Sequence, residues 1–126
     1  MKQIVSRVKS ILIVDDSLIV MHSLIPLLET IDGIEIVIHV PTYREALEML
    51  AVIRPDLIML DICLPDKSGI ELLQKIRQKD REVLVIMVSN DAIPEYRAVC
   101  QKLGAQYFID KSKEFDLIPE LIAQES

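Results

Sequence analysis

The sequence predicts an α/β fold in which helices cover both faces of a doubly wound, five-stranded parallel sheet. Five short runs of the chain are predominantly apolar, longer segments with helical spacing separate them, and the runs show no sustained alternation of polar and apolar residues. Continuous apolar runs are typical of strands that are buried on both faces, as in a parallel sheet covered by helices. Parallel strands joined by right-handed helical crossovers give the doubly wound arrangement.

The five predicted strands are short and rich in β-branched residues, which favour extended structure. Each is bounded by polar residues or by glycine or proline. They are expected at residues 11–14, 34–40, 57–60, 83–88 and 107–109.

Five helices are expected to alternate with these strands. Thr42 and Ser68 are predicted N-caps, because a glutamate follows each of them three residues later and completes a capping-box pattern. Gly33 and Gly104 fit helix exits. Pro26 should kink the first helix or end its first part, on the solvent side. The helices are expected at residues 17–31, 42–53, 68–78, 93–103 and 114–123.

Length and composition indicate one cytoplasmic domain spanning residues 1–126. The two cysteines and two histidines have no spacing typical of a disulfide framework or a zinc site. No signal peptide is visible, and every apolar run is far shorter than the ~20 residues that span a bilayer. Acidic residues exceed basic ones by 20 to 14, a formal net charge of -6. This excess argues against a nucleic-acid-binding surface and against a basic membrane-surface domain.

Chemically active residues follow four of the predicted strands. Asp15 and Asp16 follow the first, Asp61 the third, Ser89 the fourth and Lys111 the fifth. Ligands of such sheets bind at the carboxyl ends of the strands, so these side chains should converge there. Three carboxylates in one pocket repel unless a cation is present, and a hard divalent ion such as Mg²⁺ suits them. With a lysine and a hydroxyl added, the set predicts phosphoryl transfer to a carboxylate.

The motifs around these residues resemble the receiver domain of two-component response regulators, the family that includes the single-domain chemotaxis regulator. Four segments carry the resemblance, and together they are far more specific than any one of them: residues 13–17, 60–69, 88–89 and 104–111. The resemblance extends over nearly the whole chain. It implies a flavodoxin-like fold with the strand order 2-1-3-4-5 and membership of a two-component phosphorelay.

The resemblance implies that Asp61 is the phosphoacceptor and part of a metal site. Asp15 and Asp16 match the acid pair that holds Mg²⁺, one directly and one through water. The backbone carbonyl of Cys63 matches the third protein ligand, and Mn²⁺ would suit the same oxygen atoms. The chain would be a signalling phosphoacceptor that catalyses its own phosphorylation and slow dephosphorylation, rather than a metabolic enzyme.

The resemblance also implies a conformational switch. Ser89 matches the hydroxyl residue that bonds the phosphoryl group, Lys111 the lysine that pairs with its oxygens, and Phe108 the aromatic residue that turns inward when the hydroxyl moves. Phosphorylation would then shift the surface of the fourth helix, fifth strand and fifth helix. The family usually has a proline after the lysine, often with a cis bond. Ser112 stands here, and a trans bond is expected because cis before a non-proline costs about 2.5–4 kcal/mol.

The implied partners are a histidine kinase or a histidine phosphotransfer protein, with output through partner binding or a phosphorylation-dependent homodimer. No direct contact with nucleic acid or a membrane is expected. The first helix is a candidate docking surface for the donor, because its apolar residues exceed the room that the sheet offers. Some of four residues should therefore be exposed: Leu18, Ile19, Met21 and Ile25. A wider buried stripe is the alternative.

Two other interpretations stay open. A flavin-binding module would need a Ser/Thr/Gly-rich loop after the first strand, where Asp15 and Asp16 would instead repel a flavin phosphate. The chain could also be the receiver of a longer transcription regulator, because residues 111–115 resemble receivers that precede helix-turn-helix domains. Four charged residues near the motifs are interpreted as solvated loop charges: Asp66, Lys67, Asp110 and Lys113.

Overall fold

A five-stranded parallel sheet in the order β2-β1-β3-β4-β5 forms the centre of the molecule, in a computed structural model that describes residues 7–18, 20–90 and 93–125. All strand pairs are parallel, so the predicted fold class and strand order are confirmed. The strand order reverses next to β1, and ligands bind such sheets at the carboxyl ends of the strands there. The strands are β1 (Ser10–Val14), β2 (Ile36–Val40), β3 (Leu57–Asp61), β4 (Leu84–Ser89) and β5 (Tyr107–Asp110).

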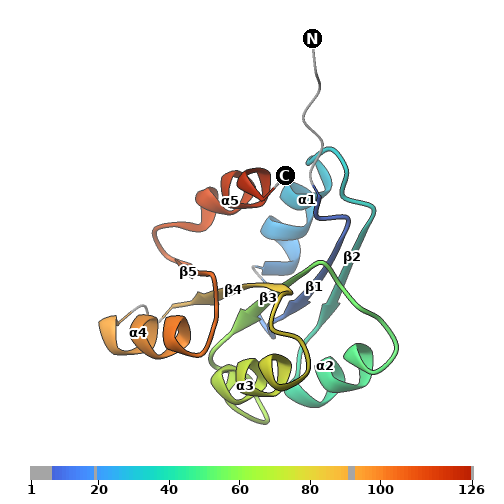
Figure 1. Ribbon diagram of the computed structural model, residues 1–126. Helices are drawn as coiled ribbons and strands as arrows, with labels where there is room; N and C mark the ends of the chain where they lie inside the picture. Colours follow the sequence, from blue (N-terminus) through green and yellow to red (C-terminus); the bar gives the residue numbers. More distant parts are fainter. Residues whose placement is uncertain (1–6, 19, 91–92, 126) are drawn as a thin grey trace.

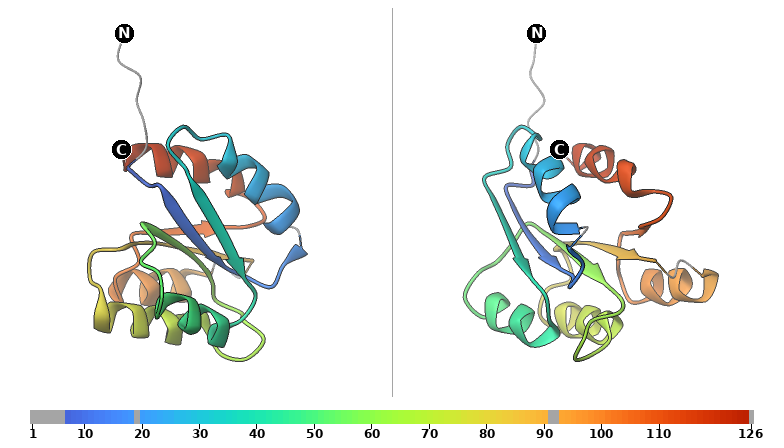
Figure 2. Two further views of the ribbon diagram at one scale, coloured as in Figure 1. Left: turned by 90° about the vertical axis from the view of Figure 1, so that its right-hand side faces the viewer. Right: turned by 180° about the vertical axis from the view of Figure 1, so that it is seen from behind.

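Helices cover both faces of the sheet, with α1 and α5 on one face and α2, α3 and α4 on the other (Figures 1 and 2). In the described part of the chain, no helix is long and apolar enough to cross a membrane. The helical elements are the π-helix η1 (Val20–Leu24), α1 (Ile25–Glu29), α2 (Tyr43–Leu50), α3 (Gly69–Lys79), α4 (Pro94–Lys102), the 3₁₀-helix η2 (Phe115–Leu117) and α5 (Ile118–Gln124).

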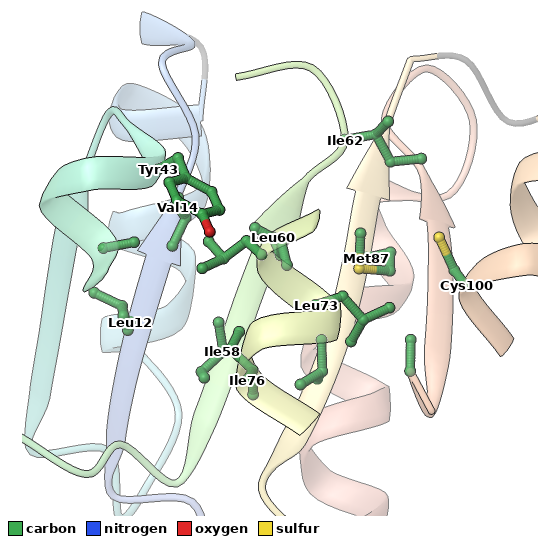
Figure 3. Close-up of a cluster of buried hydrophobic side chains, with 14 of the residues drawn as sticks. Leu12, Val14, Tyr43, Ile58, Leu60, Ile62, Leu73, Ile76, Met87 and Cys100 are labelled. Carbon is green, nitrogen blue, oxygen red and sulfur yellow. The ribbon is translucent and has the colours of Figure 1, made fainter. Parts of the chain in front are cut away.

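The sheet has an apolar core on each face. Alternate residues of β1 point to opposite faces, so Leu12 and Val14 belong to the core under α2–α4, whereas Ile11 and Ile13 belong to the core under α1 and α5. Figure 3 shows the first of these cores, where strand residues meet side chains of α3 such as Leu73. This two-sided burial explains why the central strands are apolar throughout.

The predicted helix ends are confirmed at several places. The Thr42 hydroxyl accepts a hydrogen bond from the backbone N–H of Glu45 at 3.0 Å, and the Ser68 hydroxyl accepts one at 3.1 Å from the first turn of α3. Each cap satisfies a helix N–H that has no partner within the helix. Gly33 and Gly104, which follow helices, have φ of 98° and 103°. These values lie in the left-handed region that glycine adopts readily.

Within the predicted helical segment 17–31, the structure has two helical elements, η1 and α1, which meet at Leu24. Pro26 lies in the first turn of α1 and is exposed. It has no N–H to donate to the carbonyl four residues earlier, so an uninterrupted α-helix cannot pass through it. The expected break and its solvent-side position are therefore confirmed.

Strand β2 departs from the expectation that all five strands are buried on both faces. Ile36 is 53% exposed, and most of the strand is only half-buried. The physical reason is its place at the edge of the sheet, where fewer neighbours cover its side chains.

Candidate functional site

Three carboxylates lie together at the carboxyl ends of β1 and β3. One oxygen from each of Asp15, Asp16 and Asp61 lies within 4.8 Å of the other two. Asp15 and Asp61 are buried, at 2% and 6% exposure, whereas Asp16 is exposed. The cluster forms because β1 and β3 pair in a register that sets Val14 beside Leu60, so Asp61, the last residue of β3, meets the two acids that follow β1.

Lys111 approaches this cluster from the end of β5, which lies two strands away from β3 in the sheet. Its Nζ lies 2.5 Å from Asp15 Oδ2 and 3.2 Å from Asp61 Oδ2, and its side chain is only 10% exposed. Its backbone N–H donates to the carbonyl of Ser89 at 2.9 Å, which ties the end of β5 to the end of β4. Residues that are far apart in the sequence thus form one buried ionic group.

The charges of this group do not balance, because one ammonium faces three carboxylates. Burial raises the pKa of Asp61, and the charge of Asp15 raises it further against the opposing effects of Lys111 and the Cys63 amide. Burial alone would lower the pKa of Lys111, but hydrogen bonds and charge from Asp15 and Asp61 outweigh it and raise that pKa. A divalent cation would offset the excess negative charge, and carboxylate oxygens are the donors that hard cations prefer.

The remaining predicted site residues lie around this group. Ser89 is the last residue of β4 and is buried at 1% exposure. The backbone N–H of Cys63 donates to Asp61 Oδ1 at 3.2 Å. Phe108 lies in β5 and is half-buried, with the Arg97 guanidinium 4.9 Å from its ring centre. The switch roles of Ser89 and Phe108, and metal binding by the Cys63 carbonyl, stay predictions.

Gly69 is a residue of the site to which the sequence assigned no role. Its N–H donates to the carbonyl of Ile62 at 2.6 Å. A Cβ at this position would lie 1.8 Å from the backbone oxygen of Asp61. The close approach is a tertiary contact between the end of β3 and the start of α3, and the only signal for it in the sequence is a glycine after the Ser68 cap.

Two of the charges interpreted as solvated have specific structural partners. Asp66 accepts hydrogen bonds from the backbone N–H groups of Tyr43 and Arg44, at 2.9 and 3.0 Å, and so connects the β3–α3 loop to the start of α2. Asp110 accepts from both the N–H and the hydroxyl of Ser112, at 2.9 and 2.6 Å. Asp66 is exposed and Asp110 half-buried, as expected of loop charges near solvent, but both also organise loops beside the site through these hydrogen bonds.

Two further expectations about the chain near the site can be compared with the structure. No cis peptide bond occurs in the described residues, so the trans bond before Ser112 is confirmed.

On the first helix, Leu18 is 67% and Met21 39% exposed, as expected for a docking surface. Ile25 is half-buried against the core under α1 and α5, so only part of the four-residue set is exposed, as the prediction allowed. Ile19 lies outside the described residues.

The family model of the response regulator receiver domain matches residues 11–123. With the parallel sheet and the acidic group at its carboxyl edge, this match defines the class of protein: a receiver domain of a two-component system. The chain belongs to the response regulator receiver domain family.

Individual relatives agree with this assignment. The chain is 40% identical over 105 residues to a protein-glutamate methylesterase/protein-glutamine glutaminase from Trichodesmium erythraeum, a match that covers 80% of the chain and 29% of that relative. The chain spans less than a third of the length of the methylesterases that it matches.

Solved structures show the same fold. A CheY-like receiver domain protein from Methanospirillum hungatei is 32% identical, with a TM-score of 0.82 and coverage of 94% of this chain and 93% of that one. The response regulator domain of CheB from Thermotoga maritima is 29% identical, with a TM-score of 0.79 and coverage of 94% of each chain.

Proposed function

We propose that the chain acts as a single receiver domain in a cytoplasmic phosphorelay and accepts a phosphoryl group on Asp61 from a histidine kinase or a histidine phosphotransfer protein. The observation that carries the proposal is the buried Asp61 carboxylate, which lies within 4.8 Å of two further carboxylates and within 3.2 Å of the Lys111 ammonium. Simple structural ion pairs do not need this excess of negative charge. A site that takes up a cation and an anionic phosphoryl group does.

The transfer follows from the chemistry of these side chains. A carboxylate oxygen of Asp61 attacks phosphorus and forms the P–O bond, while the P–N bond to the donor imidazole breaks. The imidazole, protonated on its other nitrogen, leaves as a neutral ring. Lys111 faces Asp61 at 3.2 Å and would stabilise the negative charge on the phosphoryl oxygens. In the slow dephosphorylation, water attacks phosphorus, the P–O bond to Asp61 breaks, and inorganic phosphate leaves the regenerated carboxylate.

The donor set fits a hard divalent cation, because it offers carboxylate oxygens within 4.8 Å of one another. Asp15, Asp16, Asp61 and the backbone carbonyl of Cys63 would hold Mg²⁺, with Mn²⁺ as a substitute. A bound Mg²⁺ would neutralise charge on the transferring phosphoryl group. By favouring the charged form of Asp61, the cation would also oppose the rise in pKa that burial causes.

The proposed output is a shift of the surface formed by α4, β5 and α5. An added phosphoryl group brings about -1.5 to -2 charge and new acceptor oxygens. Ser89, at the end of β4, would bond to these oxygens, and Phe108 would move in response. The new surface would bind a partner or a second copy of the chain, with no direct contact to nucleic acid. The match to the methylesterase relative covers 29% of that relative's length, so the proposal concerns receiver function alone.

Incubation with acetyl phosphate and Mg²⁺, followed by intact mass measurement, tests the proposal. We expect one phosphoryl adduct on the wild type and none on Asp61→Asn, because the amide cannot act as the nucleophile. Asp116→Asn is the matched control, since Asp116 is an exposed acid in η2, and this variant should be phosphorylated normally. An adduct that persists in Asp61→Asn would contradict the assignment, as would a wild type that neither forms an adduct nor binds beryllofluoride.

Mg²⁺ should raise the midpoint of thermal unfolding of the wild type, because a ligand that binds only the folded state stabilises it. At 100 times its Kd, the cation would add ~2.7 kcal/mol. Asp16→Ala should lose this response without losing stability in the absence of the metal, because Asp16 is exposed and its removal relieves repulsion in the cluster. Asp116→Ala should keep the response. An equal Mg²⁺-induced shift in the wild type and Asp16→Ala would show that the ion binds elsewhere.

A further inference from the structure

The turn that follows β5 sets the backbone position of Lys111, and therefore the point from which its side chain extends to the acidic group. The Lys111 N–H donates to Ser89 in β4. Successive N–H groups of a strand point to opposite sides, so the N–H of Asp110 points away from β4, toward the open edge. Because β5 is an edge strand, no further strand in the described part of the chain accepts from that N–H.

Glu114 supplies the missing acceptor. Its Oε1 accepts the Asp110 N–H at 3.1 Å, and its own N–H donates to the Asp110 carbonyl at 2.8 Å. Glu114 therefore bonds to both the backbone N–H and the backbone carbonyl of Asp110, the residue immediately before Lys111. Ser112 strengthens the same turn through its two bonds to the Asp110 carboxylate.

The carboxylate of Glu114 also forms an ion pair with α4. Arg97 Nη2 lies 2.7 Å from Glu114 Oε1, and the two side chains are 40% and 34% exposed. Arg97 Nη1 donates to the Phe108 carbonyl at 3.2 Å. Two roles for Glu114 can be distinguished: it can hold the Asp110 backbone as an acceptor, or it can join α4 to the turn through its charge.

We propose that Glu114 is a positioning residue for Lys111 and that it acts chiefly by accepting the Asp110 N–H, with the ion pair to Arg97 secondary. An ion pair that is a third or more exposed contributes little, whereas an edge-strand N–H that loses its acceptor lets the turn move. Lys111 faces Asp15 and Asp61 at 2.5 and 3.2 Å, so a displacement of its backbone by an ångström changes both contacts. The inference rests on the proposed function.

Three variants separate the two roles. Glu114→Ala removes both the acceptor and the charge, and Glu114→Gln keeps an oxygen acceptor but loses the charge. The double variant Arg97→Glu/Glu114→Arg restores an ion pair but offers no acceptor, because a guanidinium only donates. Glu120→Ala is the control, since Glu120 is an exposed glutamate of α5.

The measurement is the Mg²⁺-dependent rate of phosphorylation by acetyl phosphate, followed by intact mass. We expect the maximal rate to fall by about three- to tenfold in Glu114→Ala and in the double variant. Glu114→Gln should retain at least half of the wild-type rate. The Mg²⁺ concentration for half-maximal rate should stay unchanged in all variants, because the three clustered carboxylates are intact. A general disruption of the site would change this concentration as well as the maximal rate.

Each other outcome overturns the inference. A slow Glu114→Gln with a normal double variant would show that the ion pair, and not the acceptor, is responsible. Rates within twofold of wild type for all variants would show that Glu114 does not position Lys111, while phosphorylation of the wild type would leave the proposed function intact. An absence of phosphorylation in the wild type itself would remove the proposed function and this inference with it. Should Glu114→Ala unfold, the glutamine and double variants still give the comparison.

Discussion

Replacing Gly69 by alanine is expected to lower the free energy of unfolding by about 3 kcal/mol, the upper end of typical overpacking costs, and to slow phosphorylation of Asp61. The added methyl group would lie 1.8 Å from the Asp61 carbonyl oxygen and 2.8 Å from its carbonyl carbon. Both are backbone atoms of a buried strand, so neither can move aside as a flexible side chain would. The start of α3 must shift instead.

The shift would act directly on the site. The Gly69 N–H donates to Ile62 at 2.6 Å, and the Cys63 N–H donates to Asp61 Oδ1, so a displaced α3 pulls on the segment that orients the Asp61 carboxylate. Gly69 does not have a positive φ. The predicted loss therefore comes from steric contact and not from backbone strain.

Urea unfolding of the two variants Gly69→Ala and Gly33→Ala checks this prediction. Gly33 has a φ of 98° and precedes β2. It therefore lies near the amino ends of the strands, whereas the acidic group lies at their carboxyl ends. Its replacement should cost about 1–2 kcal/mol through left-handed strain and leave the phosphorylation rate unchanged. If Gly69→Ala loses no more stability than Gly33→Ala and is phosphorylated at the normal rate, the close approach does not constrain the site.

Replacing Lys111 by methionine is expected to lower the free energy of unfolding at pH 7 by roughly 3 kcal/mol without metal, as when one partner of a buried ion pair is removed. Methionine keeps a long apolar side chain but removes the only ammonium that contacts Asp15 and Asp61 in the described part of the chain. Two buried carboxylates then face each other without compensation. Phosphorylation by acetyl phosphate should also slow by at least about tenfold, since the phosphoryl oxygens lose their cationic partner.

The pH dependence of this loss has a definite sign. The Lys111 pKa is raised above 10.5 in the folded state, so its stabilising effect is fully present at pH 7 and disappears only as the pH rises through that raised pKa. The Asp61 pKa is raised above its ordinary value of 3.8, so the charged carboxylate begins to cost stability as the pH rises above 3.8 and costs the full amount above its raised folded pKa. The difference between wild type and Lys111→Met should therefore shrink as the pH falls toward 4.

Urea unfolding of wild type and Lys111→Met between about pH 4 and pH 8, a range in which Lys111 stays charged and the carboxylate cost changes, gives the measurement. Lys75→Met is the control, because Lys75 is an exposed lysine of α3, and it should change stability little at any pH. Adding Asp61→Asn to Lys111→Met should recover part of the loss by removing one of the two carboxylates. A loss in Lys111→Met that equals the control, or that grows in acid, would show that the ammonium does not balance these carboxylates.

Much of the fold could be predicted because its signals are local. The apolar runs around Leu12, Ile58 and Ile86 mark strands buried on both faces, and the Thr42 and Ser68 caps mark helix starts that the structure confirms. The break at Pro26 is also local, since one missing N–H is enough to interrupt a helix. The resemblance to receiver domains added the strand order, which the alternation alone does not give.

The sequence by itself determined which residues follow the strands, and therefore that Asp15, Asp16, Asp61 and Lys111 converge at one edge of the sheet. Only the tertiary structure decided that Asp15 and Asp61 are buried while Asp16 is exposed. Three contacts are likewise visible only in the tertiary structure. Asp66 accepts from the start of α2, Gly69 packs against the Asp61 carbonyl, and Glu114 accepts from the Asp110 N–H. The physical reason is that periodicity and capping are set by neighbours along the chain, whereas these contacts depend on how strands and loops from separate parts of the chain pack in three dimensions.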